Sequence, residues 1–167
     1  MSKRLILVRH GNAKSGTYGV ADFDRALSTI GVNEAQEMAF RIKNRDLMPQ
    51  AIISSPALRA ISTARIFAGI WGRQAEEILT SDTAYASSVS SLLRIVNGIE
   101  NDVSAAVLFG HNPELSTLAD YLTEAGVSPL PTCGVVIIDF DLNDWHMVSK
   151  GLGTMLLFDY PGADHAL

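Results

Sequence analysis

The sequence predicts an α/β fold: a three-layer α/β/α sandwich around a mostly parallel central sheet. Short apolar runs, typical of buried strands, alternate with amphipathic stretches of helical period along the 167 residues. Hydrophobic residues make up 47% of the chain and charged residues 19%, which is the balance of an ordinary globular protein. No internal repeat or linker interrupts this alternation. We therefore expect one domain over residues 1–167.

The first half of the chain predicts two strand–helix units. Leu5 to Val8 form the first expected strand, and a loop rich in small and polar residues follows from 12 to 24. Ser28 or Thr29 is expected to cap the next helix, where apolar residues recur at helical spacing up to Ile42. Residues 51–54 predict the second strand, with Ser55 as N-cap and Pro56 as first helical residue of the helix behind it.

The second half continues the alternation and ends in a hairpin. A strand over 77–80 and a helix containing Leu92 to Val96 are expected to precede the strand 105–109. Asn112 and Pro113 are the expected cap and first residue of the next helix. The segments 134–142 and 145–150, joined by a turn at Asn143-Asp144, predict a β-hairpin at one edge of the sheet.

Charge and composition exclude several kinds of protein. The net charge of −5 argues against nucleic acid or an anionic membrane as the main partner. Arg9 interrupts the N-terminal apolar stretch before it reaches the length of a signal sequence, and no run approaches the ~20 apolar residues of a membrane span. The single cysteine, Cys133, cannot form an internal disulfide and is expected to be a packed thiol. A soluble, cytoplasmic protein is therefore expected.

Two histidines each directly follow a predicted strand. His10 lies in the turn after the first strand, and His111 follows the strand 105–109. Turns at the carboxyl ends of parallel strands line the crevice where open α/β sheets bind ligands. Arg9 precedes the first histidine, and Arg59 lies in the first turn of the helix behind a third such turn. Two imidazoles and two guanidiniums at one crevice indicate a phosphoryl-transfer site.

These residue types suit phosphoryl transfer. Guanidinium groups are permanently charged and can bind two oxygens of a phosphoryl group at once. A histidine can attack phosphorus as a covalent nucleophile when the attacking nitrogen is neutral, and nearby arginines favour that form. The other ring nitrogen then needs a partner, expected to be a backbone carbonyl or a hydroxyl group. The four histidines lack the spacing of a metal site, so no zinc is expected.

Three motifs resemble those of the histidine phosphatase superfamily, also called the phosphoglycerate mutase-like superfamily. They are Arg9-His10-Gly11, the segment Ser54-Ser55-Pro56 with Arg59-Ala60 behind it, and Gly110-His111-Asn112-Pro113. Residues 22–31 also resemble the segment that follows the nucleophile in the small SixA-like phosphohistidine phosphatase branch. That branch typically has Arg-Pro-Leu-Thr there, so Ala26 and Ser28 depart from it. The resemblance runs from the first strand to Leu122.

The resemblance implies a role for each matching residue. His10 would be the phosphorylated nucleophile, Arg9 and Arg59 would hold the phosphoryl oxygens, and His111 would donate a further hydrogen bond to them. Asn12 would help to bind phosphate, and Arg25 would lie near the substrate mouth. No metal or other cofactor is implied, and the product would be inorganic phosphate.

The stretch after the third predicted strand departs from the mutase and phosphomonoesterase branches, which usually carry an acid there. Here Asp82 is the only carboxyl, and it is the tentative general acid; a loop or capping role is the alternative. Asp22 and Asp24 are expected to be solvated loop carboxylates. Since a protonated phosphoramidate nitrogen leaves more easily than an alkoxide, a weak or absent acid favours a phosphohistidine protein as substrate.

Other functions remain open at this point. A small-molecule phosphomonoesterase of the same superfamily would need Asp82 or a loop carboxyl as its acid. A mutase would need a pocket closed to water. The same site could also bind a phosphorylated partner without turning it over, although a pure binding domain does not need His10.

Overall fold

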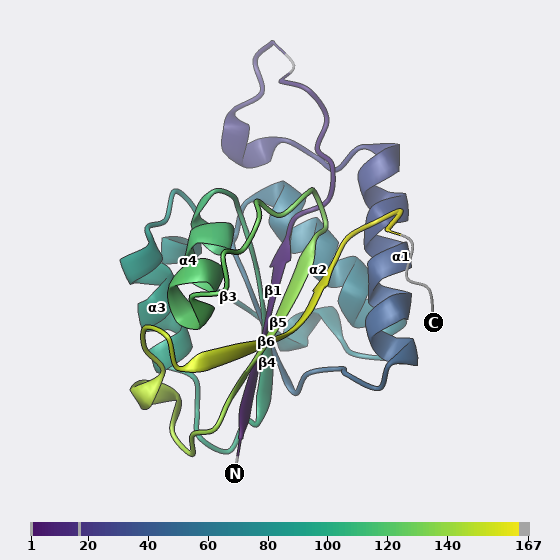
Figure 1. The fold of residues 1–167 in the computed structure, drawn as a ribbon. Helices are drawn as coiled ribbons and strands as arrows, with labels where there is room; N and C mark the ends of the chain where they lie inside the picture. The colour runs from purple at the N-terminus through teal and green to yellow at the C-terminus, as the bar shows by residue number, and fades with distance from the viewer. Residues whose placement is uncertain (1, 17, 164–167) are drawn as a thin grey trace.

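A six-stranded sheet with helices on both faces forms the core of the computed structural model, which describes residues 2–16 and 18–163 (Figure 1). The strand order is β3-β2-β4-β1-β5-β6. The strands are β1 (Lys3–Arg9), β2 (Ala51–Ser54), β3 (Ile78–Thr80), β4 (Ala105–Gly110), β5 (Val135–Phe140) and β6 (Gly153–Asp159). The first four strands of that order are parallel, whereas β5 and β6 are antiparallel to their neighbours. The predicted fold class is confirmed.

Four α-helices complete the two outer layers: α1 (Thr29–Asn44), α2 (Leu58–Ile70), α3 (Val89–Asn97) and α4 (Glu114–Thr123). In Figure 1, α1 and α2 cover one face of the sheet and α3 and α4 the other. Strand β1 supplies both cores, because successive side chains point to opposite faces. Leu5 and Leu7 pack with α3 and α4, whereas Ile6 and Val8 pack with α1 and α2. Among the described residues, no helix is long and apolar enough to cross a membrane.

The carboxyl ends of three adjacent parallel strands meet at one edge of the sheet. Arg9 at the end of β1 is paired with Gly110 at the end of β4, and β2 ends beside Phe109 on the other side of β4. The ladder continues into the turns, since the His10 N–H donates to the Gly110 carbonyl at 3.0 Å. The turns after the three strands therefore lie side by side, as the parallel topology predicts.

Two helices begin later than the sequence predicts. Helix α2 starts at Leu58 with Ala57 as N-cap, because the Ser55 hydroxyl accepts from the Ala57 N–H inside the preceding turn. Helix α4 starts at Glu114 with Pro113 as N-cap. The side chain of Asn112 is not the cap, because its amide donates to the Leu130 carbonyl and its oxygen accepts from Ser116. Ser28 does cap α1, accepting from the Gly31 N–H.

The predicted C-terminal hairpin is right in its antiparallel pairing and wrong in its second strand. Strand β6 spans Gly153–Asp159, whereas the segment 145–150 contains the 3₁₀ helix η4 (Trp145–Met147). One local and one long-range contact hold this turn. The Asp144 side chain accepts from the His146 N–H, and the fully buried Trp145 indole donates to the Val103 carbonyl. The chain therefore starts its return strand only after Trp145 is anchored in the core.

Candidate active site

The His10 imidazole is buried and held in one tautomer. Its Nδ1 lies 2.7 Å from the Gly11 carbonyl oxygen, and only 8% of the residue is exposed. A carbonyl oxygen can only accept, so Nδ1 carries the proton and Nε2 keeps its lone pair. The backbone carbonyl expected from the sequence as the partner of this ring is thus provided by the next residue. The arrangement leaves Nε2 suited to nucleophilic attack.

Two glycines let the turn that carries His10 approach the start of α1. A Cβ on Gly31 would lie 2.1 Å from the Asn12 carbonyl oxygen, and a Cβ on Gly11 would lie 2.8 Å from the Gly31 oxygen. The Gly11 N–H donates to Thr63 Oγ1 on α2 at 3.0 Å. The turn that carries His10 is therefore fixed by both helices on its side of the sheet.

His111 lies next to His10 and is oriented by a serine. The two ring centroids are 5.2 Å apart, and His111 Nε2 lies 2.8 Å from Ser55 Oγ. Because that hydroxyl oxygen already accepts from the Ala57 N–H, its hydrogen is free to be donated to Nε2. His111 would then carry its own proton on Nδ1. This nitrogen is buried and has no hydrogen-bond partner among the described residues.

Two arginines flank the histidine pair. Arg9 donates from Nη1 to the Leu130 carbonyl at 2.9 Å, while its buried Nε has no partner among the described residues. Arg59 is 7% exposed and donates from Nη1 to the Asp22 carbonyl at 2.7 Å. The structure therefore brings His10, Arg9, Arg59 and His111 together, as the three motifs predict. The two unpartnered nitrogens, on Arg9 and His111, can both serve an anion.

Burial keeps both imidazoles neutral at neutral pH. It lowers the pKa of His10 to about 4; the Gly11 hydrogen bond opposes this shift, and the charges of Arg59 and Arg9 add to it. The pKa of His111 falls to about 3, first through burial and then through the charges of His10 and Arg59. The arginines thus act in the direction expected from the sequence, but burial is the larger cause.

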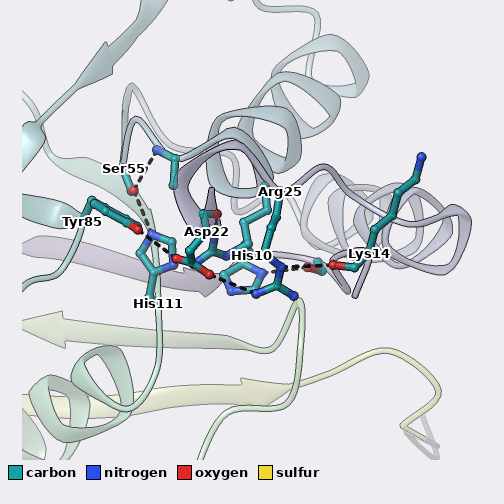
Figure 2. A network of polar contacts seen from close by, with 10 residues as sticks. His10, Lys14, Asp22, Arg25, Ser55, Tyr85 and His111 are labelled. Carbon is teal, nitrogen blue, oxygen red and sulfur yellow. Dashed lines mark hydrogen bonds and ion pairs between the residues drawn. The ribbon is translucent and has the colours of Figure 1, made fainter. Parts of the chain in front are cut away.

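Asp22 occupies the centre of the polar network, although the sequence indicates only a solvated loop carboxylate. It lies in the 3₁₀ helix η1 (Asp22–Asp24), and Figure 2 shows it between the histidines, Tyr85 and Arg25. Oδ2 accepts from the Tyr85 hydroxyl at 2.8 Å and from Arg59 at 3.1 Å, and Oδ1 accepts from Arg25 at 3.1 Å. The hydrogen bonds from Tyr85 and Arg25 are the main causes that lower the pKa of Asp22 to about 2.

A pocket of about 210 Å³ opens at this network. It is lined by Asp22, Arg59, Tyr85, Ala86, His111, Asn112 and Glu114. Glu114 and Tyr85 were not singled out as site residues from the sequence, and Ser55 was expected only as a helix cap. No group of three metal-ligating side chains occurs in the described part of the chain.

His10 and Arg9 adjoin this pocket without being part of its lining, and the three remaining candidates also lie outside the lining. Asp82 begins the 3₁₀ helix η3 (Asp82–Ala84) and is exposed. Asn12 Oδ1 accepts from the Ser28 hydroxyl at 2.6 Å, which ties it to the start of α1. Arg25 donates to the Lys14 carbonyl as well as to Asp22, and its charge contributes to the lowered pKa of His10.

Comparison with known proteins agrees with this geometry. The sequence profile of the histidine phosphatase superfamily (branch 1) matches residues 5–81, which include His10 and Arg59. A structure from Agrobacterium tumefaciens, provisionally named phosphohistidine phosphatase SixA, superposes with a TM-score of 0.81 at 25% identity over 96% of this chain and 99% of that one. The partial sequence match and the fold therefore agree on the histidine phosphatase superfamily as the group of proteins that this chain resembles.

Further relatives of this histidine phosphatase-like chain are similar over most of its length. A protein histidine phosphatase SixA complexed with tungstate has the same fold, with a TM-score of 0.79 at 21% identity over 95% of this chain and 97% of that one. An uncharacterized chloroplastic protein of Arabidopsis thaliana is 26% identical, over 87% of this chain and 70% of its own length. An uncharacterized protein of Mycobacterium tuberculosis is also 26% identical, over 86% of this chain and 93% of its own length.

Proposed function

We propose that this chain is a phosphohistidine phosphatase whose catalytic cycle passes through a phosphoryl group on His10. One observation carries the proposal: two neutral imidazoles, which follow β1 and β4, lie together with two guanidiniums from the end of β1 and the start of α2. His10 and His111 lie 5.2 Å apart by ring centroids, and both Arg9 and Arg59 act on them electrostatically. The buried, unpartnered Arg9 Nε and His111 Nδ1 would be satisfied by phosphoryl oxygens.

The proposed chemistry follows from the tautomers. His10 Nε2 attacks phosphorus while Arg9, Arg59 and His111 Nδ1–H hold the equatorial oxygens, where charge accumulates in the transition state. The bond between phosphorus and the leaving nitrogen breaks, the electron pair stays on that nitrogen, and a proton already on the other ring nitrogen lets the substrate histidine leave as a neutral group. Water then attacks the phosphoryl group on His10, the bond from phosphorus to Nε2 breaks with its electron pair returning to that nitrogen, and inorganic phosphate leaves with the hydrogens of the water. None of these steps requires a metal, because the cationic side chains neutralise the charge.

Phosphohistidine is favoured over a phosphate ester by the state of two carboxyls: Asp22, which lines the pocket, and Asp82, the acid expected from the sequence. Asp22 has a pKa of about 2 and is therefore ionised at neutral pH, so it is a poor proton donor. Asp82 is exposed and does not line the pocket. An alkoxide leaving group needs a proton from an acid, whereas an imidazole does not. The similarity to SixA structures supports the same substrate class, a phosphohistidine on a protein.

The test compares an N-linked with an O-linked substrate. The purified protein is incubated with a protein phosphorylated on histidine and, separately, with p-nitrophenyl phosphate, and released phosphate is measured. We expect turnover of the phosphohistidine protein, which His10→Ala abolishes, and an acid-labile phosphoryl group on the wild-type enzyme after rapid quenching. Binding of either substrate without turnover would overturn the proposal in favour of a phosphoprotein-binding domain.

The second candidate is a small-molecule phosphomonoesterase, and Glu114 is the observation that favours it. Glu114 lines the same pocket as Arg59 and His111, and an ester leaving group would need an acid in that pocket. If the chain has this function, p-nitrophenyl phosphate is hydrolysed faster than phosphohistidine, and Glu114→Gln abolishes that hydrolysis.

A further inference from the structure

Glu114 is the one carboxylate in the pocket lining that lacks a charge partner. It is the first residue of α4, three residues after His111, and it is partly buried. No hydrogen bond or ion pair joins its carboxylate to any residue that the structure describes. Asp22, the other carboxylate of the pocket, is compensated by Arg25, Arg59 and the Tyr85 hydroxyl. Glu114 therefore presents an uncompensated acceptor to whatever fills the pocket.

The pocket lining divides into a part that can hold the phosphoryl group and a part that faces the leaving group. Arg59 and His111 belong to the first part, together with the neighbouring Arg9 and His10. Tyr85, Ala86 and Glu114 lie on the same pocket without belonging to that cationic group. The Tyr85 ring packs edge-on against His111, with centroids 5.6 Å apart, and so forms an aromatic wall. An aromatic wall and a free carboxylate suit a flat leaving group that donates a hydrogen bond.

The chemistry of phosphohistidine supplies such a donor. The imidazole carries the phosphoryl group on one ring nitrogen, and the second nitrogen can bind a proton. In that protonated form, cleavage of the phosphorus–nitrogen bond returns the electron pair to the first nitrogen. The second nitrogen keeps its hydrogen, and neutral histidine departs. No acid has to deliver a proton during the step. A carboxylate beside the second nitrogen favours the protonated form, because an opposite charge nearby stabilises it.

We propose that Glu114 is the residue that selects the leaving group: its carboxylate accepts a hydrogen bond from the distal N–H of the substrate imidazole. The inference rests on the proposed function and adds to it, because it explains how a site without a conventional acid discriminates between substrates. The uncompensated charge also disfavours phosphate esters that carry a carboxylate close to the phosphoryl group.

The test measures a ratio of two activities. In Glu114→Gln the side chain keeps its shape and can still accept a hydrogen bond, but the charge is gone. We expect kcat/KM for a phosphohistidine peptide to fall about tenfold, while kcat/KM for p-nitrophenyl phosphate changes less than about twofold. Asp120→Asn is the matched control on the same helix, since Asp120 does not line this pocket and an amide oxygen can still accept from the Val127 N–H. It should leave both activities unchanged.

A pH profile separates this role from a merely structural one. The kcat for the phosphohistidine peptide falls on the alkaline side as the bound imidazole loses its proton. Removing the Glu114 charge should move that fall to lower pH by about one unit. Loss of a purely structural contact would not move it.

Three outcomes would overturn the inference while leaving the proposed function in place. The first is an unchanged substrate ratio in Glu114→Gln, whether both activities stay the same or fall equally, and the second is an alkaline limit that does not move. A selective loss of p-nitrophenyl phosphate hydrolysis would also overturn it, by assigning Glu114 as the acid for an ester. Failure of the wild-type protein to hydrolyse phosphohistidine would instead refute the proposed function itself.

Discussion

Acidification from pH 7 to pH 5 should destabilise the folded protein through the two active-site imidazoles. The pKa of His10 is lowered to about 4 and that of His111 to about 3, from 6.5 in the absence of burial. Between these values the unfolded chain binds a proton at each histidine and the folded chain does not. The stability associated with the neutral imidazoles is therefore fully present above pH 6.5 and is lost progressively as the pH falls toward 4 and then 3.

The size of the effect follows from the same values. A pH of about 5 lies about 1.5 units below the pKa of 6.5 that each histidine has in the unfolded chain. At about 1.4 kcal/mol per pH unit, this difference corresponds to about 2 kcal/mol of unfolding free energy per site. The two sites together should contribute about 4 kcal/mol, a large share of the ~5–15 kcal/mol that is typical of a domain. Asp22 does not contribute in this window, because its pKa of about 2 lies far below it.

Urea unfolding in phosphate-free buffer at the two pH values tests this prediction. The matched control is the double variant His10→Asn and His111→Asn, which retains every other titrating group. Wild type should lose about 4 kcal/mol more unfolding free energy than the double variant between the two conditions. Equal losses in the two proteins would refute the reasoning, because they would mean that the imidazoles titrate normally in the folded state.

Three further predictions concern single residues. Asp82→Asn should change kcat/KM for either substrate less than about twofold, because the side chain is exposed outside the pocket; a tenfold loss of ester hydrolysis would restore it as the acid. Gly31→Ala should lower the urea-unfolding free energy by about 2 kcal/mol or more, whereas Gly69→Ala, where a Cβ meets nothing within 4 Å, should not lower it. Ser55→Ala should reduce kcat/KM about tenfold through loss of the His111 hydrogen bond, and an unchanged rate would contradict the assigned tautomer.

The sequence predicts that four residues lie together at the centre of the site, because it predicts where the strands end. These residues are Arg9, His10, Arg59 and His111. Apolar runs locate the buried strands, and parallel strands bring their carboxyl ends to one edge, so residues directly after the runs must be neighbours. His10 and His111 follow β1 and β4, which are hydrogen-bonded to each other throughout. The prediction for Arg59 also requires the start of the helix after β2. That helix begins later than Ser55 and Pro56 indicate, but Arg59 still lies in its first turn.

The role of Asp22 could not be obtained in this way. It lies in a segment without periodicity, and its partners Arg59 and Tyr85 are 37 and 63 residues away in the chain. No local pattern distinguishes such a carboxylate from a solvated one. The misplaced last strand has a similar cause: the burial of Trp145 depends on Val103 and Asn97, which the chain supplies from other elements. Both errors arise where a tertiary contact decides the outcome.

The position of His10, the proposed nucleophile, also depends on polar contacts at the opposite end of β1. Both faces of β1 are buried, so its apolar pattern alone cannot select one register against β4 and β5. Lys3 fixes the register of β1 against β4, because its buried ammonium donates to the carbonyls of Asn101 and Val103, just before β4. Arg4 fixes the register of β1 against β5 through a bidentate ion pair with Asp139, its direct partner on β5.

A shift of β1 by one residue would break both sets of contacts and leave a buried ammonium without partners, at a cost of several kcal/mol. The same shift would move His10 about 3.3 Å along the strand, away from the position opposite Gly110 from which its imidazole meets His111. Lys3 and Arg4 take no part in the chemistry. They nevertheless determine where His10 lies, because a strand is rigid along its length and β1 is fixed from the end that carries Lys3 and Arg4.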